Sequence, residues 1–199
     1  WYAAPADTPS GEHNWPMHRY DAGNTAHNPD THGPKDESEV KWVFNFGKGN
    51  SITTSIEPTQ IVVADGMIFF GVGIDVYVMY AFSSVEGHPV WEWPPPGTPT
   101  SRRWAQDPPA YHDGSLYAVD VHLMNFNAEK GELIWEEGIG GGAHQEPIYA
   151  DGSVYVHGGE KVHSFSTDGE TEWTADFGSP RPLAYADSKL GVADTDETT

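Results

Sequence analysis

The sequence predicts an all-β protein built from β-propeller blades, each a four-stranded antiparallel sheet. Three observations predict this class. Asp-Gly turns recur between short apolar runs, and a glycine stands four residues before a tryptophan in three successive segments. No segment has the i, i+3, i+4, i+7 apolar spacing of an amphipathic helix. The abundance of aromatic residues (8 Trp, 9 Tyr and 8 Phe), with 22 Gly and 16 Pro, is also typical of all-β proteins.

The Asp-Gly turns predict the first hairpin of each repeat. A type I′ turn needs positive φ at both central residues, and Asp-Gly between two β-rich runs is a strong signal for it. The third copy, for example, lies between Ile148-Tyr149 and Val154-Tyr155-Val156. The turns stand at 65–66, 113–114 and 151–152, with a weaker copy at Asp187-Ser188.

A second hairpin in each repeat ends in tryptophan. Its glycine and tryptophan are Gly87 and Trp91, then Gly131 and Trp135, then Gly169 and Trp173, and an earlier Trp42 ends a unit whose beginning is not recognisable. The tryptophans are 49, 44 and 38 residues apart, which suits four strands per repeat. We expect each indole to be structural, covering the adjoining blade where a glycine leaves the backbone surface flat.

The repeats divide the chain into two parts. Residues 1–39 form a largely irregular N-terminal segment, and residues 40–199 form blades at approximately 57–93, 107–137, 146–175 and, in part, 181–199. About three and a half blades make an incomplete ring, which leaves an edge and an apolar face uncovered. The chain also begins with Trp1 and not with methionine. We therefore expect a piece of a longer protein, with closure by several copies or by a partner as the alternative.

The pattern Ala81-x-Ser83-x-x-x-Gly87-x-x-x-Trp91 resembles the tryptophan-docking repeat of PQQ-like (quinoprotein-type) propellers. The segment from Trp15-Pro16-Met17 to Asn28-Pro29 resembles the opening segment of PQQ-repeat proteins from haloarchaea. The two resemblances cover nearly all of the chain. They imply a propeller, typically of seven or eight blades, but not one function, because the family spans dehydrogenases, assembly-factor lipoproteins and uncharacterised surface proteins.

A dehydrogenase of this family would hold PQQ in the central channel, typically with a calcium ion and an Asp base. The chain has no motif for these residues, no cysteine and no Asp-rich calcium loop. The sequence therefore predicts no catalytic residue and no required cofactor. PQQ or Ca²⁺ remains the alternative if the chain is a fragment of a PQQ-dependent oxidoreductase.

Acidic residues precede proline where three innermost strands begin, at Glu57, Asp107 and Glu146. Because the innermost strand of a blade lines the channel, these carboxylates predict a partial ring that binds a cation such as Ca²⁺ or Mg²⁺. A solvated carboxylate beside a proline that starts a strand is the alternative.

Other candidate ligand-binding residues lie in loops between blades. Arg102 and Arg103 are the only paired arginines of the chain and adjoin Trp104, a combination that suits a carboxylate or a sulfated sugar. Pairing of these arginines with nearby acids is the alternative. His144 follows a glycine-rich connector, and Arg181 takes the place of the acidic residue in the fourth blade.

The charge of the chain limits its partners. Asp and Glu total 30 against 10 Lys and Arg, a net charge of −20, which excludes nucleic acid and disfavours anionic membranes. The Asp and Glu residues are spread along the whole chain, which predicts an acidic surface all round. Such a surface suits a medium of high salt, where dissolved ions screen the repulsion. No apolar run reaches the ~18 residues of a membrane span. We expect an exported or cell-surface, non-catalytic scaffold or binding module whose partner is a protein or further blades of the propeller; a glycan- or cation-binding propeller is a further alternative.

Overall fold

The computed structural model describes residues 16–17, 22, 42–44, 57–73, 77–97, 107–140, 146–177 and 182–192. These residues contain fifteen β-strands, and none of them belongs to a helix that is long and apolar enough to cross a membrane. The strands are β1 (Glu57–Pro58), β2 (Val62–Ala64), β3 (Met67–Gly73), β4 (Tyr77–Ser83), β5 (Pro89–Trp93), β6 (Ala110–His112), β7 (Ser115–Val119), β8 (His122–Asn127), β9 (Leu133–Gly138), β10 (Ile148–Ala150), β11 (Ser153–Gly158), β12 (Lys161–Ser166), β13 (Thr171–Asp176), β14 (Leu183–Ala186) and β15 (Lys189–Val192).

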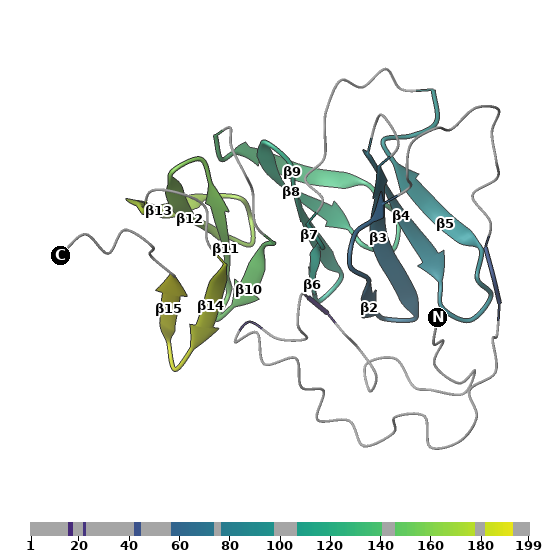
Figure 1. Ribbon diagram of the computed structural model, residues 1–199, viewed down its shortest axis with the longest axis horizontal. Helices are drawn as coiled ribbons and strands as arrows, with labels where there is room; N and C mark the ends of the chain where they lie inside the picture. Colours follow the sequence, from purple (N-terminus) through teal and green to yellow (C-terminus); the bar gives the residue numbers. More distant parts are fainter. Residues whose placement is uncertain are drawn as a thin grey trace.

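The strands form four successive antiparallel sheets (Figure 1). Blade 1 contains β1 to β5; its innermost strand is in two pieces, because β1 and β2 both pair with β3. Blade 2 (β6 to β9) and blade 3 (β10 to β13) are four-stranded meanders, and blade 4 is described as the hairpin of β14 and β15. The predicted all-β propeller class is confirmed, with three blades and the first two strands of a fourth.

The Asp-Gly turns have the backbone conformation that a type I′ hairpin needs. Asp113 and Gly114 have φ of +43° and +80°, and even the weaker copy at Asp187 and Ser188 has φ of +50° and +56°. The two other turns share the positive signs. These turns fix the register of the two inner strands in every blade.

A β-bulge beside each tryptophan recurs in the two outer strands. In blade 2, Asn125 pairs with Trp135 while Phe126 pairs with Leu133, so Ile134 is the additional residue. The register shifts at the equivalent place in blades 1 and 3. The bulge directs Trp135 toward the next blade and leaves Ile134 56% exposed.

Each docked tryptophan joins its blade to the next. The indole of Trp91 lies over Gly131 of blade 2, and its Nε1 donates a hydrogen bond of 2.8 Å to the carbonyl of Ala128. Trp135 lies in the same way over Gly169 of blade 3 and donates to the carbonyl of Thr167 at 2.9 Å. Glycine is needed at these positions because a side chain would enter the space of the indole.

Trp42 repeats this geometry ahead of blade 1. Its ring lies over Gly87, and its Nε1 donates to the carbonyl of Ser84 at 3.1 Å. Trp42 thus takes the position that the outer strand of a preceding blade would supply. In blade 3, Trp173 of β13 is 41% exposed.

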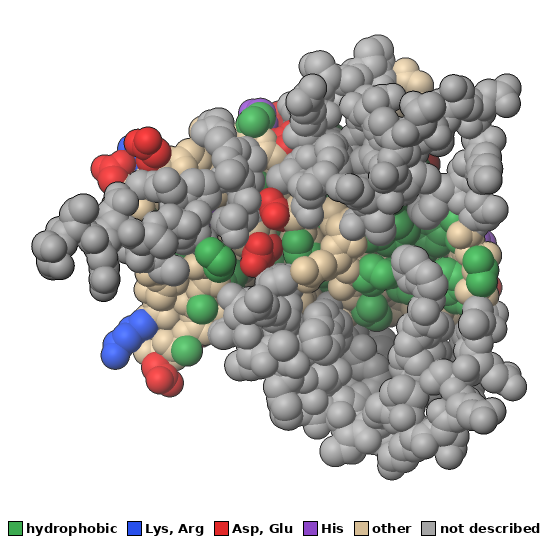
Figure 2. Space-filling view, viewed as in Figure 1, with side chains coloured by type: hydrophobic (Ala, Val, Ile, Leu, Met, Phe, Trp, Pro, Cys, Tyr) green, Lys and Arg blue, Asp and Glu red, His purple; other side chains and the backbone are tan. Residues whose placement is uncertain are grey.

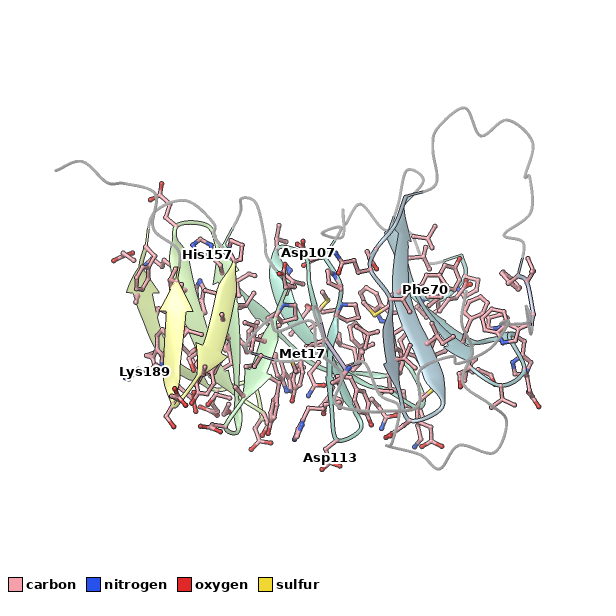
Figure 3. The ribbon with its side chains drawn as sticks, turned by 60° about the horizontal axis from the view of Figure 1, so that its bottom comes forward. Met17, Phe70, Asp107, Asp113, His157 and Lys189 are labelled. Carbon is pink, nitrogen blue, oxygen red and sulfur yellow. The ribbon has the colours of Figure 1, made fainter. Side chains whose placement is uncertain are left out.

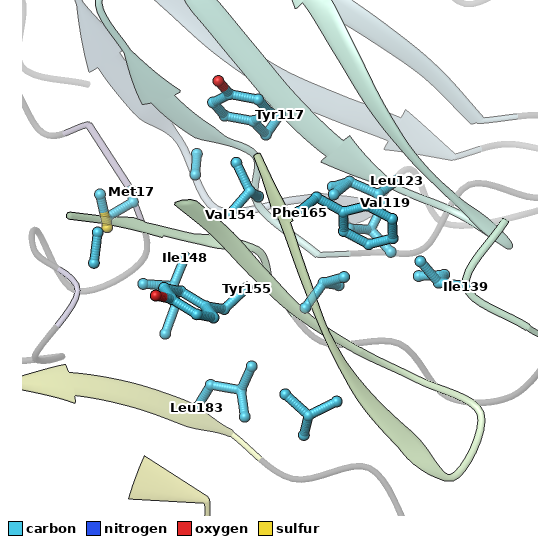
Figure 4. Packing of buried hydrophobic residues seen from close by; sticks show 14 residues of the cluster. Met17, Tyr117, Val119, Leu123, Ile139, Ile148, Val154, Tyr155, Phe165 and Leu183 are labelled. Carbon is cyan, nitrogen blue, oxygen red and sulfur yellow. The ribbon is translucent and has the colours of Figure 1, made fainter. Parts of the chain in front are cut away.

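The largest buried cluster lies where blades 2, 3 and 4 meet (Figure 4). It contains Leu123 of β8, Val154 and Phe165 of blade 3, and Leu183 of β14. Every residue of β11 in blade 3 is buried. A sheet that buries both faces is expected for a blade held between two others.

A tyrosine–aspartate hydrogen bond also connects successive blades. Tyr185 Oη donates to Asp151 Oδ2 at 2.7 Å, and Tyr111 Oη donates to the carboxylate of Asp65, so a turn aspartate accepts from the innermost strand of the next blade. Burial and this hydrogen bond raise the pKa of Tyr111 to about 12. The phenol is therefore protonated at neutral pH, as a donor must be.

We expect Tyr111→Phe to lower the free energy of unfolding by about 1–2 kcal/mol, because it removes a hydrogen bond to a charged acceptor and retains the ring. Urea denaturation measures this loss. The matched control is Tyr149→Phe. The ring of Tyr149 stacks on His112 with 3.6 Å between the ring centroids, and phenylalanine keeps that ring. The control should change the free energy by less than about 0.5 kcal/mol. Equal losses in the two variants would show that the hydroxyl of Tyr111 has no special role.

Candidate functional site

The starts of the innermost strands and the turns between second and third strands lie at one end of the blades, which we call the loop face. Figure 3 labels Asp107 and His157 at this end, whereas Asp113 and Lys189 lie at the opposite end with the Asp-Gly turns. The outermost strands β5, β9 and β13 also end at the loop face. Loops gathered in this way on a rigid scaffold are where binding sites usually form.

Two carboxyl groups approach each other on the loop face. Asp107 precedes β6 and Glu146 precedes β10, the innermost strands of neighbouring blades that contact each other. Each is followed by a buried proline, Pro108 or Pro147, and each side chain is partly exposed. Burial and, to a smaller extent, the negative charge of Glu146 raise the pKa of Asp107 to about 7. Asp107 therefore exists in both protonation states near neutral pH.

Asp120 forms a second polar group, in the turn between β7 and β8. It is 1% exposed, and its Oδ1 accepts hydrogen bonds from the backbone N of His122 at 2.6 Å and from Nδ1 of the same residue at 3.2 Å. Oδ2 of Asp120 has no hydrogen-bond partner among the residues that the structure describes. The bonds to His122 hold the turn in shape.

Two histidines of blade 3 are buried near the loop face. His157 in β11 is completely buried, and His163 in β12 is 8% exposed. Burial lowers the pKa of His163, which favours the neutral ring. Gly158 packs closely against Ile139 of the connection that leaves blade 2, since a Cβ at Gly158 would lie 2.7 Å from the Ile139 carbonyl oxygen. Gly158, which follows His157, is therefore part of the packing between blades 2 and 3.

The structure places only part of the predicted site. Arg102, Arg103, Trp104, His144 and Arg181 lie outside the described residues, so a ligand at these residues stays a prediction. Glu57 begins β1 opposite Gly73, and its side chain also lies outside the description. The described side chains contain no group of three or more His, Asp or Glu that could hold a metal ion. The cation ring of Glu57, Asp107 and Glu146 stays a prediction, which calorimetry with calcium on Glu146→Gln can check.

Three described residues of the N-terminal part, Pro16, Met17 and Ala22, contact the channel side of the innermost strands. The backbone N of Tyr111 in β6 donates to the carbonyl of Pro16 at 2.6 Å, and the backbone N of Tyr185 in β14 donates to the carbonyl of Ala22 at 2.6 Å. Met17 is 8% exposed and belongs to the cluster between blades 2, 3 and 4. Each hydrogen bond contributes about 1 kcal/mol and the buried methionine about 2 kcal/mol.

Sequence reasoning missed Met17, Asp120, His157 and His163. Asp120 carried a usable signal, since it interrupts the apolar run from Leu116 to Val121. A polar residue inside such a run is often buried and hydrogen-bonded. The contacts of Met17 have no local signal, because its segment lacks any strand or helix periodicity.

Comparison with known proteins identifies the repeat. A family model described as outer membrane protein assembly factor BamB matches residues 75–197, which is more than half of the chain. No curated protein matches.

Among solved structures, 97 chains match. BamB from Moraxella catarrhalis is 17% identical with a TM-score of 0.54, covering 80% of this chain and 50% of its own. The match to quinohemoprotein alcohol dehydrogenase from Comamonas testosteroni has 18% sequence identity and a TM-score of 0.50. It covers 86% of this chain and 28% of the dehydrogenase chain. The match to quinohemoprotein alcohol dehydrogenase ADHIIG from Pseudomonas putida HK5 has 17% sequence identity and a TM-score of 0.51. It covers 82% of this chain and 26% of the dehydrogenase chain. These likenesses show the fold, and the chain spans half or less of the length of each.

The described inner wall offers the quinone cofactor PQQ acidic side chains. PQQ is a tricarboxylate, whereas the acidic side chains of Asp107 and Glu146 stand where the innermost strands of blades 2 and 3 begin. The channel-side edges of β6 and β14 are bonded to Pro16 and Ala22. Without a cation these like charges disfavour the cofactor, whereas a calcium ion between them would remove the repulsion.

Proposed function

The chain belongs to the family of outer membrane protein assembly factor BamB, and from this premise we propose that it is a non-catalytic propeller that binds another polypeptide. The observation that carries the proposal is the exposed indole of Trp173 in blade 3. Trp173 is 41% exposed, whereas Trp91 and Trp135 lie over glycines of the following blade. An indole at this repeat position has an apolar face and an N–H that suit a glycine-containing turn of a further hairpin.

The occupant of this surface is either a partner protein or further blades of the same propeller. Docking at Trp91 defines what the occupant must offer, namely a glycine beneath the indole and a carbonyl for Nε1, as Gly131 and Ala128 do. Burying the exposed part of the Trp173 side chain would contribute about 1–2 kcal/mol. This contribution makes Trp173 one anchor of a larger interface.

The test is to isolate the tagged protein from its own cells after crosslinking and to identify the attached polypeptides by mass spectrometry. We expect the recovery of an attached polypeptide to fall at least about tenfold in Trp173→Glu. If further blades of the propeller are the occupant, their docking should weaken to the same extent. Ile134→Glu is the matched control, because it places the same charge at a 56% exposed position of the rim of blade 2. Equal recovery from both variants would refute binding at Trp173.

A part of a PQQ-dependent oxidoreductase is the competing function, favoured by the likeness to quinohemoprotein alcohol dehydrogenases. Reconstitution with PQQ and calcium separates the two. We expect no stoichiometric change in quinone absorbance, because the free edges of β6 and β14 are already bonded to Pro16 and Ala22. Stoichiometric binding would replace the scaffold proposal. A glycan-binding role would instead be supported by glycan-array binding that the Arg102/Arg103 double variant loses.

We also propose that the protein is exported or held at the cell surface and works in high salt. The name of the matched family places its relatives in outer-membrane protein assembly, and the charge of −20 suits a medium in which ions screen repulsion. In the view of Figure 2, acidic side chains are scattered toward the left, and hydrophobic ones gather on the right, over blade 1. Fractionation of the source cells tests the location.

We expect the melting temperature to rise by about 4–8 °C between 0.1 M and 1 M NaCl, which corresponds to about 2 kcal/mol for a chain of this size. Over this range the Debye length falls from about 10 Å to about 3 Å, so repulsion among the excess carboxylates is screened. Differential scanning fluorimetry measures the change. An unchanged or lower melting temperature would contradict adaptation to salt.

A further inference from the structure

The joint between blades 3 and 4 is formed on its inner side. The ring of Tyr185 in β14 stacks on that of Tyr155 in β11 with 5.5 Å between the ring centroids, and Leu183 is buried in the cluster that the two blades share. Farther out on blade 3, Trp173 and Phe177 are 41% and 40% exposed. Two large apolar side chains thus stay exposed beside an interface that is already in place, which is typical of a docking surface. They are the first part of what we call the Trp173 surface.

The joint between blades 2 and 3 shows what covers these two positions in a complete joint. Trp135 is the equivalent of Trp173 there and lies over Gly169, in the turn between β12 and β13. Ile139 is the equivalent of Phe177, since each donates its backbone N–H to the turn between the second and third strands of its own blade. Ile139 is only 2% exposed. An outer hairpin, formed by the third and fourth strands of a blade, is therefore the element that covers the indole.

The outer edge of β15 is the second part of the Trp173 surface (Figure 1). β3, β7 and β11, the second strands of blades 1 to 3, pair on both sides, whereas β15 pairs with β14 alone among the residues that the structure describes. Leu190 of β15 faces Tyr185 as Leu116 of β7 faces Tyr111, so the two leucines are equivalent. Leu116 is completely buried, but Leu190 is partly exposed.

A buried phenylalanine of the third strand faces this aliphatic position in each of blades 1 to 3. The pairs are Ile68 with Phe82, Leu116 with Phe126, and Val154 with Phe165. A serine or asparagine follows each phenylalanine and closes the turn, because its side-chain oxygen accepts a backbone N–H. These residues are Ser83, Asn127 and Ser166, with distances of 3.1, 2.9 and 3.1 Å. The glycine beneath the indole comes three or four residues later.

We propose that the Trp173 surface accepts a β-hairpin of another polypeptide, which adds the third and fourth strands to blade 4. The inference rests on the function proposed above and specifies its partner. The hairpin carries a phenylalanine to face Leu190, then a serine or asparagine, and three or four residues later a glycine to lie beneath Trp173. Residues 193–199 contain none of these four residue types. Pairing of main chains along β15 supplies affinity, and the phenylalanine and the glycine supply selectivity.

The test adds a fluorescein-labelled peptide with the sequence of residues 122–138 to the full chain. This peptide is the chain's own outer hairpin of blade 2 and carries the whole pattern. Fluorescence anisotropy in about 1 M NaCl, which screens repulsion between the acidic partners, should show one-to-one binding. We expect binding to weaken at least about tenfold with Gly131→Ala in the peptide or Trp173→Glu in the chain. Ile134→Glu in the chain is the control and should bind the peptide as the wild type does.

Hydrogen exchange followed by NMR shows whether the peptide pairs with β15. The N–H of Tyr185 points out of the β14–β15 ladder, since it donates to Ala22. In an antiparallel ladder the N–H of its partner Leu190 then points outward on the other side. The Leu190 amide should exchange at least about tenfold more slowly when the peptide is bound. The Gly191 amide is directed toward β14 and should change little.

The proposal is overturned if the peptide does not bind, or if Gly131→Ala in the peptide has no effect. It is also overturned if the Leu190 amide already exchanges slowly in the chain alone, because the edge of β15 would then be paired. Self-association that Trp173→Glu abolishes, measured by sedimentation, would make a second copy the occupant and would refute the proposal as well. If crosslinking recovers a polypeptide that depends on Trp173 but the hairpin does not bind, the proposed function stands and only this inference fails.

Discussion

Replacing Gly131 with alanine is expected to lower the free energy of unfolding by about 3 kcal/mol. Gly131 has φ of +70°, a backbone conformation that costs alanine about 1 kcal/mol. The new Cβ would also lie 2.6 Å from Cδ2 of Trp91, so the indole must move, at a cost of about 1–3 kcal/mol for overpacking. Movement of the indole further weakens the hydrogen bond from its Nε1 to the carbonyl of Ala128.

Gly114→Ala is the matched control for this variant. Gly114 has a similar φ of +80°, but nothing lies within 4 Å of the position of its Cβ. The control should therefore lose only the backbone contribution, about 1 kcal/mol. Urea denaturation measures both variants, and the difference of about 2 kcal/mol is the effect of docking alone. Losses of equal size would show that Trp91 contributes little to the joint between blades 1 and 2.

The sequence predicts the blades well because their signals are local. Asp113-Gly114 forms its turn from the preferences of two residues, and its hairpin follows from the runs on each side. The sequence does not reveal which glycine each tryptophan covers. Gly87 and Trp91 belong to one hairpin, but Trp91 lies over Gly131 of the next blade. That pairing depends on the stacking of whole sheets.

The parts that could not be predicted depend on contacts across blades. The sequence indicates an irregular N-terminal segment, and nothing periodic in it marks Pro16 and Met17 as residues that contact the innermost strands. The same is true of the candidate site. The pattern of an acidic residue before proline identifies Asp107 and Glu146, but their proximity follows from the packing of β6 against β10.

Asp107→Asn is expected to raise the free energy of unfolding by about 1–2 kcal/mol at pH 8 and to leave it unchanged at pH 4. The pKa of Asp107 is raised from 3.8 to about 7 in the folded protein. Between these values the folded state binds a proton that the unfolded chain has lost, so stability falls as the pH rises from about 4 to 7. A shift of about three units corresponds to at most about 4 kcal/mol, and partial exposure of the side chain reduces this figure.

Asparagine removes the ionisation and retains the shape of the side chain. At pH 4 the folded wild type is already neutral at this position, so the two proteins should unfold at the same urea concentration. At pH 8 only the wild type has to hold a partly buried carboxylate beside Glu146. Urea denaturation at intervals from pH 4 to pH 8 measures the divergence, and parallel curves over this range would contradict a raised pKa.

Glu146→Gln distinguishes the two causes of the raised pKa. Burial is the larger cause and remains in this variant, whereas the negative charge is removed. The pKa of Asp107, followed by NMR of its carboxyl carbon, should therefore fall only part of the way toward 3.8, by less than half of the total shift. A return to about 4 would make charge repulsion the dominant cause. In that case a divalent cation placed between Asp107 and Glu146 would relieve most of the cost, and the predicted cation site would be strengthened.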